Sequence, residues 1–195
     1  FRKQPMEGVD ALPGWYNSIA AADFDADGDM DYVFGNLGTN SFLQASPQEP
    51  FSISVNDVNG DGFMDAIPSL FLYDQLDGKR TEFPLPARDE LIKEVIQMKG
   101  RFQTYKDYAR AGINTVLTDA ERTDARILRA TEFRSLLLRN EGGGKFVPLP
   151  LPSPAQWAPV YGMQATDVNQ DGYHDLLLVG NDFGTEVTIG RYDAL

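Results

Sequence analysis

Three nine-residue segments of the chain share one pattern of acidic side chains. Each has Asp or Asn at its positions 1, 3, 5 and 9 and glycine at position 6. Ca²⁺ prefers six to eight oxygen ligands at about 2.3–2.6 Å, and a tight loop with carboxylates at alternate positions supplies most of them. The glycine allows a sharp reversal, and the backbone carbonyl of position 7 can add a ligand. The pattern predicts up to three bound Ca²⁺ ions, in residues 23–31, 57–65 and 167–175.

Two other interpretations of these segments have to be weighed. Stretches rich in Asp and Gly can be solvated turns without a ligand. Agreement of three copies at five positions favours metal binding over that interpretation. The segments are not EF-hands, because an EF-hand has a bidentate carboxylate at position 12. The residues at that position are Phe34, Pro68 and Leu178.

The flanks of the three loops indicate β-strands. A short apolar run follows each loop, as is typical of a buried strand, so each loop is expected to join two strands. Asp77 and Gly78 predict a two-residue hairpin turn, and residues 142–144 predict another turn. The strands expected from these signals are 18–22, 31–35, 51–55, 66–73, 79–83, 133–139, 145–149, 161–166 and 176–180.

The periodicity changes to that of helices after Ala87. Leu91, Val95, Met98 and Phe102 recur at three- and four-residue steps, which predicts an amphipathic helix, with a short second helix near residues 105–109. A capping box, in which the Thr118 and Glu121 side chains satisfy each other's backbone donors, predicts a third helix that runs through Ala130.

The helical stretch is basic. Residues 87–140 carry eleven basic and eight acidic side chains, in a chain whose net charge is −12. One interpretation is that the insertion packs on the sheet, with its apolar stripe buried and its Arg side chains paired with nearby acids. The other is that its outer face binds an anionic partner, such as an acidic polysaccharide or a protein.

Composition excludes several classes of protein. With 29 acidic and 17 basic residues, the chain is not expected to bind nucleic acid, which needs clustered Lys and Arg. It has no cysteine, and therefore no disulfide or catalytic thiol. No apolar run approaches the roughly 18–20 residues of a transmembrane segment. The start at Phe1, without an initiator Met or signal peptide, suggests an excised or processed segment.

Loop spacing predicts a repeated architecture. The second loop starts 34 positions after the first, and the third starts 110 positions after the second. Periods near the first value are typical of propellers and solenoids. We therefore expect residues 1–195 to be a single segment of about three blades, with residues 87–131 as a helical insertion within the second blade. A closed ring needs about four to eight blades, so the segment is expected to belong to a larger propeller.

The loops and their flanks resemble the FG-GAP/VCBS repeats of integrin-like calcium-binding propellers. Residues 88–91, 140–146 and 151–156 also look like those of secreted bacterial FG-GAP proteins, relatives of the cartilage acidic protein group that often carry an ASPIC/UnbV domain. The resemblance implies a mainly β fold, a partial β-propeller built of FG-GAP/VCBS-like blades with a helical insertion. It also implies an extracytoplasmic protein that is secreted, periplasmic or attached to the cell surface.

The same resemblance implies the Ca²⁺ ligands. In that family's loops, positions 1, 3, 5 and 9 bind through side chains and position 7 through its carbonyl. The implied ligands are Asp23, Asp25, Asp27, Asp29 and Asp31; Asp57, Asn59, Asp61, Phe63 and Asp65; and Asp167, Asn169, Asp171, Tyr173 and Asp175.

The expected function is a Ca²⁺-stabilised module that binds or scaffolds an unknown protein or polysaccharide ligand, and not an enzyme. One alternative is part of a carbohydrate-active enzyme whose catalytic acids lie on loops or on missing blades. Another is a metal-sensing regulator, which micromolar Ca²⁺ affinity would favour. No catalytic residue is predicted: His174, the only histidine, is expected to face water, and Trp15 and Trp157 are expected to pack in the blades.

Overall fold

The computed structural model describes residues 6–184 and 190, which form a mainly β fold. These residues contain ten strands, five short α-helices and one 3₁₀-helix, and the strands form open sheets with no closed barrel. The chain divides into two compact units. The first unit comprises Phe1–Leu43 and Glu132–Leu195, and the second comprises Gln44–Thr131, which begins well before the predicted helical insertion.

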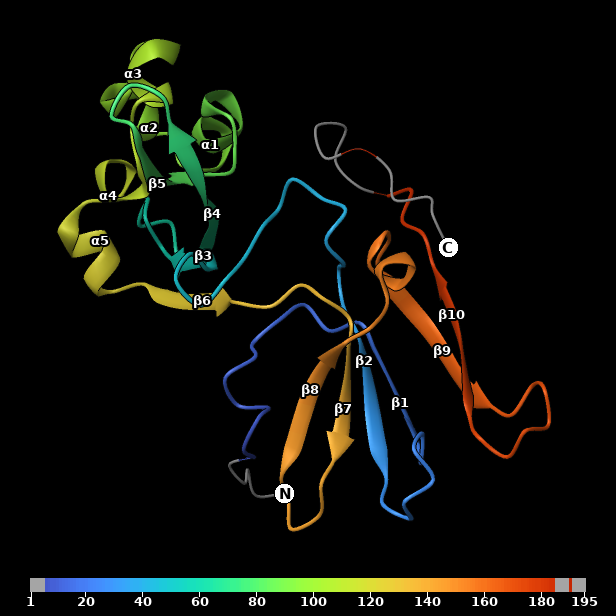
Figure 1. Cartoon of the computed structure of the whole chain (residues 1–195). Coiled ribbons are helices and arrows are strands. Elements are labelled where there is room, and N and C mark those ends of the chain that lie inside the picture. The colour runs from blue at the N-terminus through green and yellow to red at the C-terminus, as the bar shows by residue number, and fades with distance from the viewer. Residues whose placement is uncertain (1–5, 185–189, 191–195) are drawn as a thin grey trace. The chain divides into compact units, whose positions relative to one another are not determined.

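A four-stranded antiparallel sheet forms the centre of the first unit (Figure 1). Its order is β1-β2-β7-β8, so β2 pairs with a strand about a hundred residues later in the chain. Val33, Leu136 and Leu138 are almost fully buried along this pairing. All four strands were expected from the sequence, although the third starts three residues later than predicted. The strands are β1 (Ser18–Ala22), β2 (Asp31–Gly35), β7 (Leu136–Asn140) and β8 (Phe146–Pro150).

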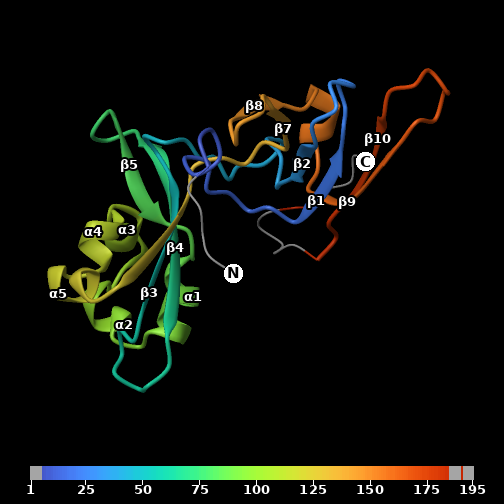
Figure 2. The ribbon, with the colours of Figure 1, turned by 90° about the horizontal axis from the view of Figure 1, so that it is seen from below.

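A two-stranded hairpin completes the strands of the first unit. It consists of β9 (Val160–Thr166) and β10 (Asp175–Gly180), and it follows the 3₁₀-helix Ser153–Gln156. Strand β9 runs beside β1 (Figure 2). The Ser18 hydroxyl donates to the Val160 carbonyl at 2.7 Å, which joins the hairpin to the four-stranded sheet.

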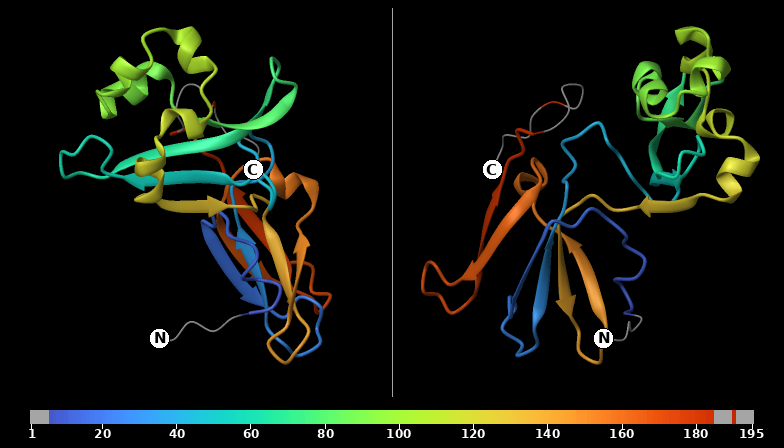
Figure 3. Two further views of the ribbon diagram at one scale, coloured as in Figure 1. Left: turned by 90° about the vertical axis from the view of Figure 1, so that its left-hand side faces the viewer. Right: turned by 180° about the vertical axis from the view of Figure 1, so that it is seen from behind.

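The second unit has its own four-stranded antiparallel sheet, in the order β5-β4-β3-β6 (Figure 3). The β4–β5 connection is a four-residue turn and not the predicted two-residue turn, because the Gly78 N–H donates to the Asp74 carbonyl at 2.8 Å. Gly78 has a φ of 66°, which a glycine adopts without strain. The strands are β3 (Phe51–Asn56), β4 (Asp65–Asp74), β5 (Lys79–Pro84) and β6 (Arg126–Ala130).

Five short helices lie between β5 and β6. The predicted apolar stripe is correct, since Leu91, Val95, Met98 and Phe102 are all buried in one cluster with Ile67 of β4. The single helix predicted over this stripe is wrong, because the backbone leaves helical geometry at Val95. The helices are α1 (Arg88–Glu94), α2 (Met98–Arg101), α3 (Tyr105–Ala109), α4 (Ile113–Val116) and α5 (Asp119–Thr123).

The capping box at the start of α5 is confirmed, and the predicted length of that helix is wrong. Thr118 and Glu121 make both reciprocal hydrogen bonds. The helix nevertheless ends at Thr123, and residues 126–130 form β6. Pairing with β3 satisfies the backbone groups that a continued helix would have satisfied internally, and it extends the sheet by one strand. In the part of the chain that the structure describes, no helix is long and apolar enough to cross a membrane.

Candidate metal sites

Each of the three acidic loops connects two neighbouring antiparallel strands. The first lies between β1 and β2, the second between β3 and β4, and the third between β9 and β10. The residue before each loop pairs with position 9 in the same register: Ala22 with Asp31, Asn56 with Asp65, and Thr166 with Asp175. The prediction that the loops join strands is confirmed. The first and third loops belong to the first unit, and the second loop belongs to the second.

One set of hydrogen bonds recurs in all three loops. The position 1 carboxylate accepts the N–H groups of positions 5 and 6, at 2.9–3.2 Å. The position 5 carboxylate accepts the N–H of position 7 at 2.8–2.9 Å. The position 9 carboxylate accepts the N–H of position 2 at 2.9–3.0 Å. These bonds hold the acidic side chains on the inside of a tightly wound loop.

Two left-handed residues produce the reversal in each loop. The glycine at position 6 has a φ of 89–95° in all three copies, as its residue type indicates. Position 4 is also left-handed, with φ of 59° at Ala26, 75° at Gly60 and 63° at Gln170. Only Gly60 is of a type that favours this conformation, since Ala and Gln have no preference for the left-handed region.

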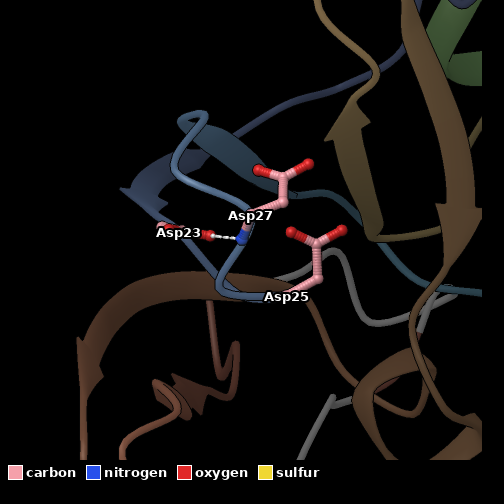
Figure 4. A group of neighbouring side chains, drawn as sticks. All are labelled: Asp23, Asp25 and Asp27. Carbon is pink, nitrogen blue, oxygen red and sulfur yellow. Dashed lines mark hydrogen bonds between the residues drawn. The ribbon is translucent and has the colours of Figure 1, made fainter.

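The structure brings three predicted ligands of the first loop together. Carboxylate oxygens of Asp23, Asp25 and Asp27 all lie within 4.8 Å of one another, and the Asp25 and Asp27 side chains project to the same side of the loop (Figure 4). Two oxygens bound to one Ca²⁺ lie at most about 5 Å apart, so this group fits a single ion. Partial desolvation and then the negative charges of Asp27 and Asp31 raise the pKa of Asp25. A bound cation would relieve this repulsion.

Asp31 and Asp29 lie outside that group of carboxylates. Asp31 is buried, and its two oxygens accept the Phe24 N–H at 3.0 Å and the Asn140 N–H at 2.8 Å. Its side chain therefore ties the loop to the end of β7. Asp29 has an exposed side chain, and its own N–H donates to Asp27.

The second loop is attached to the helices. The Asn59 amide donates to the Glu94 carbonyl at 3.2 Å, and the Gln97 amide donates to the Asn59 carbonyl at 3.1 Å. Asn59 and Asn169 replace the position 3 carboxylate of the first loop with an amide oxygen, which is also a hard oxygen donor. Phe63 and Tyr173 at position 7 have exposed side chains, so only their backbone could reach an ion inside the loop.

His174 and the two tryptophans are placed as follows. His174 is exposed, as expected, and its Nδ1 lies 3.1 Å from the Asp23 carbonyl oxygen, so the third loop touches the first. Trp15 is half-buried and packs against Phe133 with ring centroids 5.1 Å apart, which agrees with the expected packing role. Trp157 keeps 47% of its surface exposed, which does not match the expected packing role.

Two cavities of about 390 Å³ lie at the end of the β4–β5 hairpin, away from the acidic loops in the sequence. One is lined by aromatic and aliphatic side chains of β4, β5 and α3. The other is polar and is lined by residues of β4, β5 and α4, of the β4–β5 turn and of the connection between α3 and α4. Asp74 lines both of them. Sequence reasoning missed these cavities, because they form only where the helical segment folds back onto the hairpin.

Comparison with known proteins adds no further assignment. No protein-family model matches the chain, and neither a curated protein nor a solved structure matches it.

Proposed function

We propose that this chain is a Ca²⁺-stabilised, extracytoplasmic module that binds or scaffolds a protein or glycan ligand. The observation that carries the proposal is the gathering of the Asp23, Asp25 and Asp27 carboxylates within 4.8 Å, in a loop whose hydrogen bonds recur in two further loops. Carboxylate, amide and carbonyl oxygens are the donors that Ca²⁺ prefers. Extracellular modules bind Ca²⁺ at roughly 0.1–1 mM, which matches loops that are open to solvent.

The propeller assignment is part of the same proposal. Each unit contains a four-stranded antiparallel sheet, which is the size of a propeller blade. The β9–β10 hairpin would be the beginning of a third blade, and the resemblance to FG-GAP/VCBS repeats supports this interpretation. In such a module the Ca²⁺ loops stiffen the strand connections, and ligand binding takes place elsewhere on the surface.

Calcium-dependent stability tests this function directly. If each site has a dissociation constant near 0.1 mM, about 1 mM Ca²⁺ adds roughly 1.4 kcal/mol of stability per occupied site. Scanning calorimetry in chelator and in millimolar Ca²⁺ should therefore show a higher melting temperature with the metal. Mg²⁺ at the same concentration is the control, because it requires a smaller octahedral site and retains its water. Equal melting temperatures in chelator and in Ca²⁺ would exclude the proposal.

A carbohydrate-active enzyme is the second candidate, because carboxylates line a cavity outside the Ca²⁺ loops. Asp74, Asp77 and Glu82 all line the polar cavity. Two of them already have partners: Asp77 lies 3.3 Å from the Lys79 ammonium, and Glu82 accepts the Ser69 hydroxyl at 2.7 Å. We therefore favour binding over catalysis. Hydrolysis of a panel of chromogenic glycosides that disappears in Glu82→Gln would reverse this preference.

A further inference from the structure

The apolar cavity at the end of the β4–β5 hairpin contains one acidic side chain among aromatic walls. Tyr73, Phe83 and Tyr108 supply the rings, Leu72 and Leu76 supply aliphatic surface, and Asp74 is the only charged one among the described residues that line it. Tyr73 and Leu76 are largely exposed, with 61% and 71% of their surface accessible, so the cavity opens to solvent. This wall is therefore available to a ligand.

The Asp74 carboxylate is available to a cation. Its Oδ1 accepts the N–H groups of Leu76 at 2.9 Å and Asp77 at 3.3 Å, which holds the side chain in place. Among residues 6–184, no Lys or Arg forms an ion pair with Asp74. The nearby Lys79 pairs with Asp77 instead.

Tyr108, one ring of the aromatic wall, is held in place by its own contacts. The Tyr108 hydroxyl donates to the Pro86 carbonyl at 2.7 Å, and its ring meets Phe102 edge-on with centroids 5.5 Å apart. Burial, and then the charge of Glu90, raises the pKa of Tyr108 to about 12, so its hydroxyl stays protonated and keeps this bond at neutral pH. A pre-formed wall lowers the entropy cost of binding.

Aromatic rings next to a carboxylate favour one class of ligand group. Ring faces attract cations through their quadrupole, and a carboxylate binds guanidinium or ammonium through charge-assisted hydrogen bonds. The aliphatic side chains of the cavity would pack against the methylene stem of such a group. The cavity thus complements the side chain of an arginine or a lysine.

The adjoining polar cavity is lined by three acidic side chains, Asp74, Asp77 and Glu82, and by three basic ones. Lys79 and Arg80 line it, but they are engaged, with their nitrogens 3.3 Å from Asp77 and 2.7 Å from Glu49. Arg110 also lines it, and no ion pair of Arg110 occurs within the part of the chain that the structure describes. Arg110 is exposed, so it can bind a carboxylate of a ligand that covers both cavities.

We infer that the end of the β4–β5 hairpin binds an extended segment of a partner protein, with a basic side chain against Asp74 and an acidic side chain against Arg110. A polysaccharide with neutral or acidic sugars brings no cation for the first cavity, so the charges favour a peptide. This inference rests on the proposed binding function and identifies the ligand class as protein.

The first experiment isolates the cation site. The full-length protein is titrated with N-butylguanidinium chloride, and with neutral N-butylurea as a probe of matched shape, while amide resonances of Leu72, Leu76 and Tyr108 are followed by NMR. The guanidinium should bind saturably and at least about tenfold more tightly than the urea, because the urea keeps N–H donors but lacks the positive charge that strengthens hydrogen bonds to a carboxylate. Equal binding of the two probes, or no saturable binding of the guanidinium, overturns the inference.

Two variants of the same turn provide matched charge changes. Asp74→Asn keeps the Oδ1 that accepts the turn N–H groups, and it should weaken guanidinium binding about tenfold. Asp77→Asn removes the same charge from a residue that lines only the polar cavity, and it should leave guanidinium binding within about twofold. Equal losses in the two variants would mean that general charge, and not the cavity, attracts the probe.

The second experiment tests the partner class. A phage library of random linear peptides is selected on the protein, and the enriched peptides should carry a basic and an acidic residue close together. Their binding should fall in Asp74→Asn and in Arg110→Gln, and it should be unchanged in Lys106→Gln, an exposed cation of α3 that lines neither cavity. Guanidinium binding without any peptide that responds to both variants would overturn the assignment to a protein segment.

The calcium response separates this inference from the proposed function. Asp74 and Arg110 lie outside the acidic loops, so the Ca²⁺-dependent rise in melting temperature should be the same in these variants as in the original protein. Peptide binding without any effect of Ca²⁺ would leave the inference standing and remove the calcium part of the proposed function. A rise in melting temperature with Ca²⁺ but no guanidinium binding would leave the calcium part of the proposed function standing and overturn the inference.

Discussion

At the scale of single residues, each acidic loop assigns different tasks to chemically similar side chains. Asp23 winds the loop by accepting two backbone N–H groups, and it also faces Asp25 and Asp27. Asp31 is buried and joins the loop to a neighbouring strand. Asp29 faces solvent. Side chains that look equivalent in the sequence therefore differ in the structural cost of replacing them.

Asp27 and Asp29 form a matched pair for calcium binding. Asp27→Ala removes an oxygen of the three-carboxylate group and should abolish binding at the first loop. Asp29→Ala keeps the position 7 carbonyl and should change affinity by only a few fold, through the loss of a distant charge. Titration calorimetry on the two variants checks this. Equal losses of affinity would mean that the proposed positions of the ligands are shifted along the loop.

Ala26 carries backbone strain that glycine would remove. Its φ of 59° costs about 1–2 kcal/mol for a residue with a Cβ, whereas glycine adds about 0.5–1 kcal/mol of backbone entropy cost. Ala26→Gly should therefore leave stability unchanged or raise it by up to about 1 kcal/mol. Ala21→Gly, at an exposed site in β1, should lower stability by about 0.5–1 kcal/mol. Urea unfolding in chelator measures both changes, and a clear loss in Ala26→Gly would contradict the strained conformation.

At the scale of elements, ion pairs and hydrogen bonds join the short helices to one another and to the sheet of the second unit. Arg101 at the end of α2 pairs with Glu121 of α5, and it also donates to the Val116 carbonyl at 3.1 Å. The Asn56 amide donates to the Glu121 carbonyl at 2.9 Å, which connects α5 to β3. Helices of four to seven residues are not stable alone, so these contacts and the buried stripe must hold them.

The lowered pKa of Glu121 predicts that the protein loses stability in acid. Hydrogen bonding by the Arg101 guanidinium lowers the pKa of Glu121, and this outweighs the effect of partial burial, which raises it. A carboxyl whose pKa is lower in the folded protein contributes stability above its unfolded pKa, and this stability is lost as pH falls through the folded pKa. The unfolding free energy should therefore decrease as the pH is lowered from about 4.5.

Glu121→Gln tests the origin of that acid sensitivity. The variant should lose about 1 kcal/mol near pH 7, a value reduced for partial solvent exposure, and its stability should depend less on pH below 4.5. Glu94→Gln neutralises an exposed acid of α1 and should reproduce neither effect. Urea unfolding across a pH series measures the slopes. If the unfolding free energy of Glu121→Gln and of the original protein falls with the same slope below pH 4.5, the ion pair is not the cause of the acid sensitivity.

At the scale of the whole molecule, the candidate metal sites are divided between the two units. Two acidic loops belong to the first unit and one to the second, so Ca²⁺ is expected to stabilise both. The helical segment is part of the core of the second unit, because its apolar stripe covers Ile67. The interpretation that the insertion packs on the sheet is supported in this respect. Its Arg and Lys side chains are only partly paired with acids, and the described ion pairs leave Lys93 and Arg110 without one.

Deletion of residues 87–130 should therefore destroy the second unit. The deletion removes β6 from its sheet and exposes Ile67, which is completely buried in the intact protein. Loss of a whole core exceeds the 2–5 kcal/mol that a single large-to-small substitution costs, so aggregation or unfolding is expected. Size-exclusion chromatography and circular dichroism show the outcome, with the intact chain as reference. A folded monomer with three Ca²⁺ sites would show that the segment is dispensable.

The correct sequence predictions for this protein rest on local patterns. The loop positions, their flanking strands, the capping box at Thr118 and the buried stripe from Leu91 to Phe102 all follow from residues within a few positions of one another. Backbone reversal at a glycine, alternation in a strand and reciprocal capping are short-range effects, so sequence neighbours suffice to reveal them.

Long-range contacts set the remaining features, which the sequence did not reveal. Strand β2 pairs with β7, and residues 126–130 join β3 as a strand although their capping signal predicted a helix. Both outcomes depend on backbone partners far away in the chain, which override local propensity. The left-handed conformation of Ala26 and Gln170 accompanies hydrogen bonds within each loop, but the types of these two residues do not indicate it. The cavities beside Asp74 depend on segments that are distant in the chain. These cavities form because the helical segment folds back onto the β4–β5 hairpin, and residue type alone does not indicate that contact.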